Sequence, residues 1–186
     1  YHDVRMQEPQ AGVVTGLAWT SAGGEILFIE TSRTRGEGKV QITGQLGDVM
    51  KESVQIALTL VKSMFPEEAE ILNESDIHIH VPAGAVPKDG PSAGITIVTA
   101  LTSMLKEKGI SPEYAMTGEV SLRGGVMPIG GLPEKLMAAQ RAGIRTVFIP
   151  YENREDLEDV ADEVKEDLTI IPVKRIEEVL QKTNLI

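Results

Sequence analysis

The stretch Pro87-Lys88-Asp89-Gly90-Pro91-Ser92-Ala93-Gly94 lies between a strand-like run and a long apolar run with helical character. Proline fixes φ near the helical value and has no N–H to lose, so Pro91 suits the first position of a helix, with Asp89 or Gly90 as its cap. Ser92 then falls in the first turn, where backbone N–H groups are free and the helix dipole favours an anion. An oxyanion formed by attack on a carbonyl would be such an anion, which makes Ser92 a candidate nucleophile, although a serine near a helix start is more often only a cap.

The segments on either side of this stretch show the spacing of a strand and of a helix. Residues 76–81 alternate strictly, which places three apolar side chains on one face and both His78 and His80 on the other. Residues 91–106 are apolar nearly all round, so they predict a central, covered helix. The sequence therefore predicts a strand, a loop and a helix that together present Ser92.

The rest of the chain predicts one α/β (α+β) domain with a mixed sheet, N-terminal hairpins and packed helices. Apolar and β-branched runs predict strands over residues 12–20, 25–31, 40–43, 114–118, 146–150 and 168–173, the first two joined through Ser21-Ala22-Gly23-Gly24. Helical spacing predicts helices over residues 46–65, 133–142, 154–164 and 175–180. Residues 33–39 and 67–74 are expected to be surface connections, and residues 118–131 a glycine-rich segment with short β pieces.

Composition excludes several classes of protein. The 186 residues are 41% hydrophobic and 25% charged, as in a folded domain with its own core. A net charge of -10 argues against a nucleic-acid or anionic-membrane partner, because phosphate binding needs a basic face. The chain has no cysteine, which excludes disulfides, thiolate-bound zinc and thiol catalysis. Residues 1–10 are polar, without an apolar signal region or an initiator methionine, and we expect them to be a linker from a preceding region.

Two kinds of base could activate Ser92. His78 and His80 share a strand face, where a structural role is the more common one, and the spacing nominates no third ligand for a metal site. A lysine can serve if burial lowers its pKa by roughly 3 to 5 units from about 10.4. Within residues 133–142, Lys135 shares a helix face with alanines at i+3, i+4 and i+7, which suits a neutral amine in a dry site. The alternative is that its stem covers apolar surface while its ammonium group stays in water.

Several of these motifs together resemble the proteolytic domain of the Lon family of ATP-dependent proteases. The likeness is carried by residues 87–94, by Thr117-Gly118-Glu119-Val120-Ser121-Leu122-Arg123-Gly124 and by Pro128-Ile129-Gly130-Gly131-Leu132-Pro133-Glu134-Lys135, and it extends to residues 14–20 and 76–82. Because the resemblance covers essentially the whole chain, residues 11–186 are expected to form a Lon-like proteolytic domain. Residues 1–10 are then expected to be a linker from an ATPase region outside this chain.

The resemblance implies a serine endopeptidase with a Ser-Lys dyad, in which Ser92 is the nucleophile and Lys135 the general base. It implies substrates that are unfolded or damaged proteins, delivered for quality control by an ATPase module of the same polypeptide, and a hexameric ring in the full-length enzyme. No metal or cofactor is expected in this domain, and ATP and Mg²⁺ only in the ATPase module. We expect no nucleic-acid or membrane partner. The expected compartment is the cytoplasm, with the mitochondrial matrix as the alternative.

Four further residues receive roles from the same resemblance. Thr117 is expected to form a hydrogen bond near the lysine. Asp89 and Glu30 are expected to be polar neighbours that engage the lysine as the site switches between resting and active arrangements. Trp19 is expected on the substrate-binding side.

Two other functions stay open at this point. A Lon-like domain could be an assembly or binding platform that has no peptidase activity in isolation. A histidine-based hydrolase using His78 or His80 is a third hypothesis, since a serine can also be activated by an imidazole.

Overall fold

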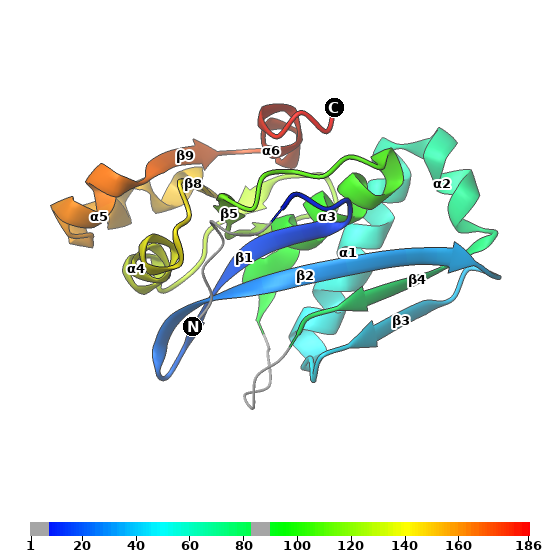
Figure 1. Ribbon diagram of the computed structural model, residues 1–186, viewed down its shortest axis with the longest axis horizontal. Helices are drawn as coiled ribbons and strands as arrows, with labels where there is room; N and C mark the ends of the chain where they lie inside the picture. The colour runs from blue at the N-terminus through cyan, green and yellow to red at the C-terminus, as the bar shows by residue number, and fades with distance from the viewer. Residues whose placement is uncertain (1–7, 83–89) are drawn as a thin grey trace.

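A seven-stranded sheet organises the computed structural model, which describes residues 8–82 and 90–186 (Figure 1). The strand order is β3-β4-β2-β1-β5-β8-β9. Strands β1, β5, β8 and β9 are parallel neighbours, β3 pairs in parallel with β4, and β2 runs antiparallel to β1 and β4. The predicted single α/β domain with a mixed sheet is therefore confirmed.

The elements follow one another along the chain with short connections. The strands are β1 (Val13–Thr20), β2 (Gly23–Arg35), β3 (Val40–Thr43), β4 (Ser75–His80), β5 (Tyr114–Met116), β6 (Glu119–Val120), β7 (Val126–Met127), β8 (Thr146–Pro150) and β9 (Thr169–Val173). The α-helices are α1 (Asp48–Met64), α2 (Pro66–Leu72), α3 (Gly94–Lys106), α4 (Leu132–Ala142), α5 (Asp162–Asp167) and α6 (Ile176–Lys182). The 3₁₀ helices among the described residues are η2 (Pro91–Ala93) and η3 (Tyr151–Asp159), and β6 and β7 form a separate two-stranded sheet.

The predicted N-terminal hairpin is confirmed, but its second strand is longer than expected. Strands β1 and β2 pair from Val13 opposite Glu30 to Thr20 opposite Gly23. Strand β2 then continues to Arg35 and pairs with β4, so the expected loop over residues 33–39 is wrong in its first half. The reason is that charged side chains on the exposed side of a strand do not prevent its backbone from joining the ladder.

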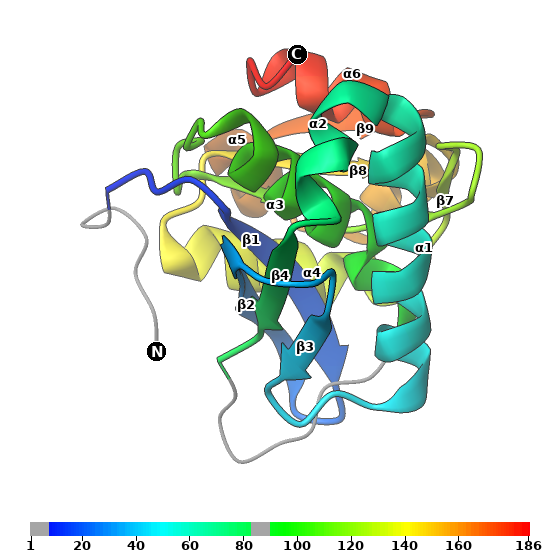
Figure 2. The same ribbon diagram turned by 90° about the vertical axis from the view of Figure 1, so that its right-hand side faces the viewer.

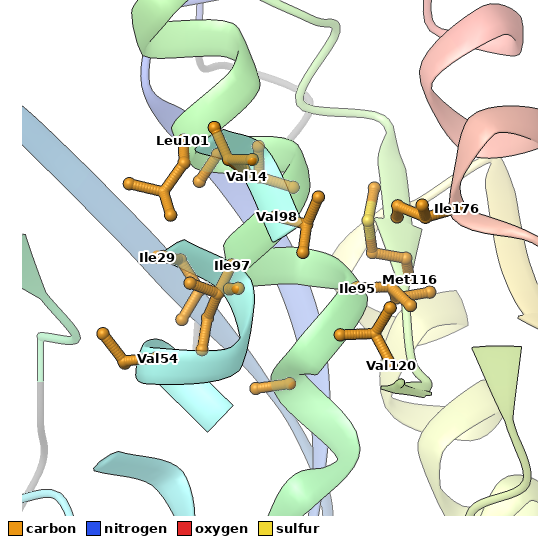
Figure 3. Close-up of a cluster of buried hydrophobic side chains, with 14 of the residues drawn as sticks. Val14, Ile29, Val54, Ile95, Ile97, Val98, Leu101, Met116, Val120 and Ile176 are labelled. Atoms are coloured by element: carbon orange, nitrogen blue, oxygen red, sulfur yellow. The ribbon is translucent and has the colours of Figure 1, made fainter. Parts of the chain in front are cut away.

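Helices cover both faces of the sheet. On one face, β1, β2 and β5 pack against α1, α3 and α6, and Val54, Ile97 and Ile176 lie in this core (Figure 3). On the other face, α4 and α5 cover a second apolar cluster. Along β8, Val147 belongs to the second cluster and Phe148 to the first, as expected for a strand buried on both sides. In Figure 2, α1 runs alongside the strands β3 and β4.

Two expected segments differ from the structure. Residues 67–74 were expected to be a connection, yet α2 occupies Pro66–Leu72, with proline at its start and two glutamates in the first turn, where the helix dipole favours them. The acidic helix expected over residues 154–164 is wrong, because η3 ends at Asp159 and α5 begins at Asp162, with Val160 extended between them. This segment has too few apolar side chains to form one continuous helix face.

The central helix is confirmed, with a tighter first turn. Pro91 begins η2, which leads directly into α3, and Gly90 precedes it with φ +133. Every residue from Gly94 to Met104 is buried. Within the described ranges, no helix combines the length and apolarity needed to cross a membrane.

Candidate active site

A cavity of about 740 Å³ lies beside the carboxyl end of β1. Its walls come from residues 18–21 at the end of β1, from residues 90–93 in and before η2, and from residues 128–130 between β7 and α4. Lys135 of α4 also lines the cavity, and α4 lies on the face of the sheet opposite to the face that α3 covers. The cavity thus joins parts of the chain that are far apart in sequence.

Ser92 lines this cavity from a turn that is held tightly in place. Its carbonyl oxygen accepts a 2.8 Å hydrogen bond from the Gly118 N–H, and the Gly118 carbonyl accepts one of 3.0 Å from the Ile95 N–H. Gly94 is also tightly packed, since an added Cβ would lie 2.8 Å from the backbone nitrogen of Val120. These contacts fix the backbone at Ser92, and Ser92 is half-buried where it lines the cavity.

Lys135 is buried to 2% exposure, although lysine is among the residues least often buried. Three alanines of α4, at positions 138, 139 and 142, are buried with it. The helix lies very close to the start of β2, because a Cβ added to Gly24 would come within 2.1 Å of the Glu134 carbonyl oxygen. This close contact places the next residue, Lys135, against the sheet.

Burial lowers the pKa of Lys135 to about 8 from 10.5, because a charged ammonium is poorly solvated there. Its Nζ donates a 3.1 Å hydrogen bond to Oγ1 of the fully buried Thr117. Among the described residues no carboxylate forms an ion pair with it to restore the ordinary pKa. At pH 7, about a tenth of such a lysine is neutral and able to act as a base.

Thr117 and Gly118 connect the two halves of the site. The Thr117 side chain accepts from Lys135, and the N–H of the following residue holds the Ser92 carbonyl. Within the described part of the chain, Lys135 has no direct hydrogen bond to the Ser92 side chain, although both residues line the same cavity. The candidate nucleophile and the candidate base therefore share one cavity, with Thr117 beside the lysine.

The other residues singled out in the sequence lie in different places. Trp19 lines the cavity and is 57% exposed, and its ring packs on Gly131, where an added Cβ would lie 2.5 Å from it. Glu30 is exposed on β2 opposite His80 and does not line the cavity. Asp89 lies outside the described residues. The roles of these residues toward the lysine or the substrate stay predictions.

The two strand histidines are engaged elsewhere. The Thr43 hydroxyl lies 2.8 Å from His78 Nε2 and 2.6 Å from His80 Nδ1. Neither histidine lines the cavity. In the described ranges, no group of three or more candidate side chains could hold a metal ion.

Sequence reasoning missed two residues that shape this site. Met50 of α1 lines the cavity, and only its place in the apolar helical pattern hinted at burial. Asn153 is buried in η3 and binds the backbone of Ile129 in the cavity wall. A single asparagine in an acidic segment carries no local signal of such a contact.

The fold and the site together define a mixed α/β domain with a serine and a buried lysine on one cavity. A family model described as the Lon protease (S16) C-terminal proteolytic domain matches residues 1–185. The chain is 59% identical over 182 residues to a Lon protease of Clostridium beijerinckii, covering 98% of this chain and 23% of that protein. It is 56% identical over 176 residues to the Lon protease of Escherichia coli K12, covering 93% of this chain and 22% of that protein.

A similar match joins this chain to a Lon protease of Methanosarcina barkeri, with 55% identity over 178 residues, which are 95% of this chain and 22% of that protein. The chain belongs to the family of Lon protease C-terminal proteolytic domains. It spans less than a quarter of the length of these relatives, at 22% to 23%.

Proposed function

We propose that this chain is a serine endopeptidase in which Ser92 attacks the peptide carbonyl and Lys135 acts as general base. One observation carries the proposal: Ser92 shares a cavity with a buried lysine whose pKa is lowered to about 8. A lysine with its ordinary pKa would be protonated at neutral pH and could not accept a proton. Membership in a family of proteolytic domains supports the same reaction.

The reaction proceeds through an acyl-enzyme. Neutral Lys135 accepts the hydroxyl proton of Ser92 while the oxygen forms a bond to the carbonyl carbon. The resulting ammonium returns that proton to the leaving amine as the C–N bond breaks. Water then attacks the acyl group, Lys135 accepts a proton from the water, and the Ser92 oxygen leaves and regains a proton. Backbone N–H groups around Ser92 stabilise the oxyanion of both tetrahedral intermediates.

Thr117 has a supporting role in this scheme. Its hydroxyl accepts a hydrogen bond from Nζ of Lys135 in the substrate-free structure. The lysine exchanges or shares this contact with the Ser92 hydroxyl when a substrate binds, because catalytic hydrogen bonds commonly tighten only in the substrate complex. Asp89 and Glu30 are proposed as polar neighbours that engage the lysine as the site switches between resting and active arrangements, and Trp19 is proposed to lie on the substrate-binding side.

The proposed substrates are unfolded or damaged proteins delivered by an ATPase module of the same polypeptide. The proposed setting is a hexameric ring in the cytoplasm. The support is that proteins named Lon protease match this chain over only 22% to 23% of their own length, so the remaining length of such proteins could contain an ATPase module.

Covalent labelling of Ser92 by a small serine-reactive phosphonate across roughly pH 6 to 10 tests the dyad. We expect the labelling rate to rise with pH around a midpoint near 8, the pKa of Lys135. Ser92→Ala should abolish labelling and cleavage, and Lys135→Arg should abolish cleavage, because an arginine stays charged. Full peptidase activity of Ser92→Ala would disprove the assignment.

The same assays separate the enzyme from a binding platform. A peptidase cleaves a short fluorogenic peptide and an unfolded protein, whereas a platform without activity cleaves neither. Matched reactions with Ser92→Ala show that any cleavage comes from this site and not from a contaminating protease.

A further inference from the structure

A buried amide lies behind one wall of the cavity. Asn153 is 3% exposed and is the only buried residue of η3. A buried amide must find hydrogen-bond partners, because leaving its groups unpaired costs free energy. The partners of Asn153 therefore indicate what the side chain does.

Asn153 binds both backbone polar groups of a single residue. Its Oδ1 accepts a 3.0 Å hydrogen bond from the Ile129 N–H, and its Nδ2 donates one of 2.8 Å to the Ile129 carbonyl. The second hydrogen of Nδ2 is donated to Oδ2 of Asp156 at 2.7 Å. A peptide N–H can only donate and a carbonyl can only accept, so this pairing works in one orientation of the amide alone.

The residue that Asn153 holds belongs to the cavity wall. Residues 128–130 all line the cavity that contains Ser92 and Lys135. Just before this segment, the Val126 N–H donates to the Lys174 carbonyl at 2.8 Å. Asn153 is thus the described side chain that fixes the middle of the wall, between the end of β7 and the start of α4.

The element that carries Asn153 is itself anchored. Leu157 of η3 packs against the second apolar cluster, and within η3 the Arg154 guanidinium lies 3.4 Å from the centre of the Tyr151 ring. The Lys174 ammonium lies 4.3 Å from the centre of the same ring. Because Leu157 and Tyr151 attach η3 to other parts of the fold, Asn153 can act as a support for the wall.

Helix α4 has independent supports. Leu132, Leu136 and Ala139 pack in the second apolar cluster, and the helix backbone lies against Gly24 of β2. Loss of the Asn153 contacts would therefore release the wall while leaving Lys135 close to its place. An effect on the wall and an effect on the lysine can be separated by kinetics. A wall that receives the peptide governs substrate binding and KM, whereas the lysine governs proton transfer and kcat.

We propose that Asn153 is a positioning residue for peptide cleavage, which holds the wall at residues 128–130 in the shape that receives the substrate by binding both backbone groups of Ile129. This inference rests on the proposed peptidase function. It adds a residue that touches neither the substrate nor the reacting atoms and acts only through Ile129.

The test compares Asn153→Asp with a matched change of another amide, on α4. Asn153→Asp keeps the shape and one acceptor but places oxygen against the Ile129 carbonyl and the Asp156 carboxylate. The control is Gln140→Glu, which also turns an amide facing an aspartate into a carboxylate, since Gln140 Nε2 donates to Asp167 Oδ2 at 2.9 Å. Asn153→Ala is the second variant, in case the aspartate prevents folding.

Three measurements are made on the protein and each variant: kcat and KM for a short fluorogenic peptide, the labelling rate of Ser92 by a small phosphonate, and hydrogen–deuterium exchange at residues 128–131. For Asn153→Asp and Asn153→Ala we expect KM to rise about tenfold or more. We expect kcat to change by less than about threefold and the pH midpoint of labelling by less than about 0.3 pH units. Exchange at the Ile129 amide should rise at least tenfold, because Asn153→Ala removes its acceptor, and in Asn153→Asp repulsion from the Ile129 carbonyl and the Asp156 carboxylate moves the side chain away from it. Gln140→Glu should leave all three measurements unchanged.

Unchanged KM in both Asn153 variants, or an equal loss in Gln140→Glu, would overturn the proposal. A fall in kcat with unchanged KM would overturn it too, because the amide would then act on the lysine and not on the wall. If the parent protein cleaves no peptide, the peptidase function fails first, and the exchange measurement still decides whether Asn153 holds the wall.

Discussion

The Nζ of Lys135 donates a 3.1 Å hydrogen bond to the Thr117 hydroxyl, and both residues are almost completely buried. This pair places a poorly solvated amine next to a group that can accept from its charged and its neutral form. A neutral hydroxyl stabilises an ammonium less than a carboxylate does, so the contact orients the lysine without restoring its ordinary pKa. The pair therefore gives the lysine both a lowered pKa and a fixed orientation, which are the two properties that a general base in a dry cavity needs.

Thr117→Val should make the lysine more acidic. The change keeps the shape of the side chain but removes the acceptor, and a hydrogen bond to a charged donor is worth about 1 kcal/mol more than one to a neutral donor. The pH midpoint of Ser92 labelling should therefore fall by about 0.7 pH units from its value near 8. Cleavage at the pH optimum should fall about tenfold, because the amine is no longer held in place.

Thr102→Val is the control for this change, since Thr102 is also buried and its hydroxyl donates to the Val98 carbonyl within α3. It should lower stability without moving the labelling midpoint. An upward or absent shift in Thr117→Val would show that the hydroxyl does not stabilise the charged lysine.

Lys135→Met should stabilise the folded protein near pH 7. The pKa of Lys135 is lowered from 10.5 to about 8, so below pH 8 both folded and unfolded chains are protonated and the folded state holds a buried charge. Between pH 8 and 10.5 the unfolded chain binds more protons, and the free energy of unfolding rises with pH. The full rise is about 3 kcal/mol, and methionine should give a stability gain of about 2 to 3 kcal/mol at pH 7.

Urea denaturation of both proteins at pH 7 and pH 10 measures this effect. The stability difference between Lys135→Met and the parent should shrink at the higher pH, where the parent lysine is neutral. Lys51→Met on the exposed side of α1 is the control and should show no such convergence. Equal stability of Lys135→Met and the parent at pH 7 would mean that burial does not penalise the charged lysine.

Local patterns nominated both members of the proposed dyad only as candidates, and the family resemblance selected them. Pro91 marks a helix start, and the alanines spaced along the face of Lys135 mark a buried face, because both signals lie within a few turns of chain. The contact between Lys135 and Thr117 could only be inferred from a family resemblance, since it joins residues 18 positions apart through the packing of α4 on the sheet.

Other features depended on partners that local patterns do not reveal. Strand β2 extends to Arg35 because β4 supplies a pairing partner, whereas its polar sequence alone indicated a loop. The hydrogen bonds of Asn153 likewise depend on how η3 lies beside the cavity wall. Such contacts follow from tertiary arrangement and overrule local propensity.

His80→Gln should leave the peptidase reaction intact. His80 and His78 both contact the Thr43 hydroxyl, and neither lines the cavity. We expect kcat/KM for a fluorogenic peptide to stay within about twofold of the parent, with at most about 1 kcal/mol lost from stability because one side-chain hydrogen bond changes. A hundredfold loss of kcat with unchanged stability would instead favour the histidine-based hydrolase.

Gly131→Ala should destabilise the cavity mouth through Trp19. Gly131 has φ +71, and an added Cβ would lie 2.5 Å from the Trp19 ring. The backbone conformation alone costs an alanine about 1 to 2 kcal/mol, and forcing the ring aside costs about 1 to 3 kcal/mol more. We expect a total loss of about 2 to 5 kcal/mol by chemical denaturation, and a rise in KM because the displaced ring changes the cavity mouth.

Two controls separate backbone strain from the clash with the ring. Gly38→Ala has a comparable φ of +92, but its added Cβ would meet no atom closer than 3.8 Å, so it should lose only the cost of backbone strain. In a Trp19→Gly background, Gly131→Ala should cost no more than Gly38→Ala does, because both the ring and the Cβ of Trp19, which would lie 2.5 Å and 2.9 Å from the added atom, are gone. If the cost of Gly131→Ala were the same with and without Trp19, the glycine would be needed for its backbone conformation alone, and the close packing of the ring would contribute nothing to stability.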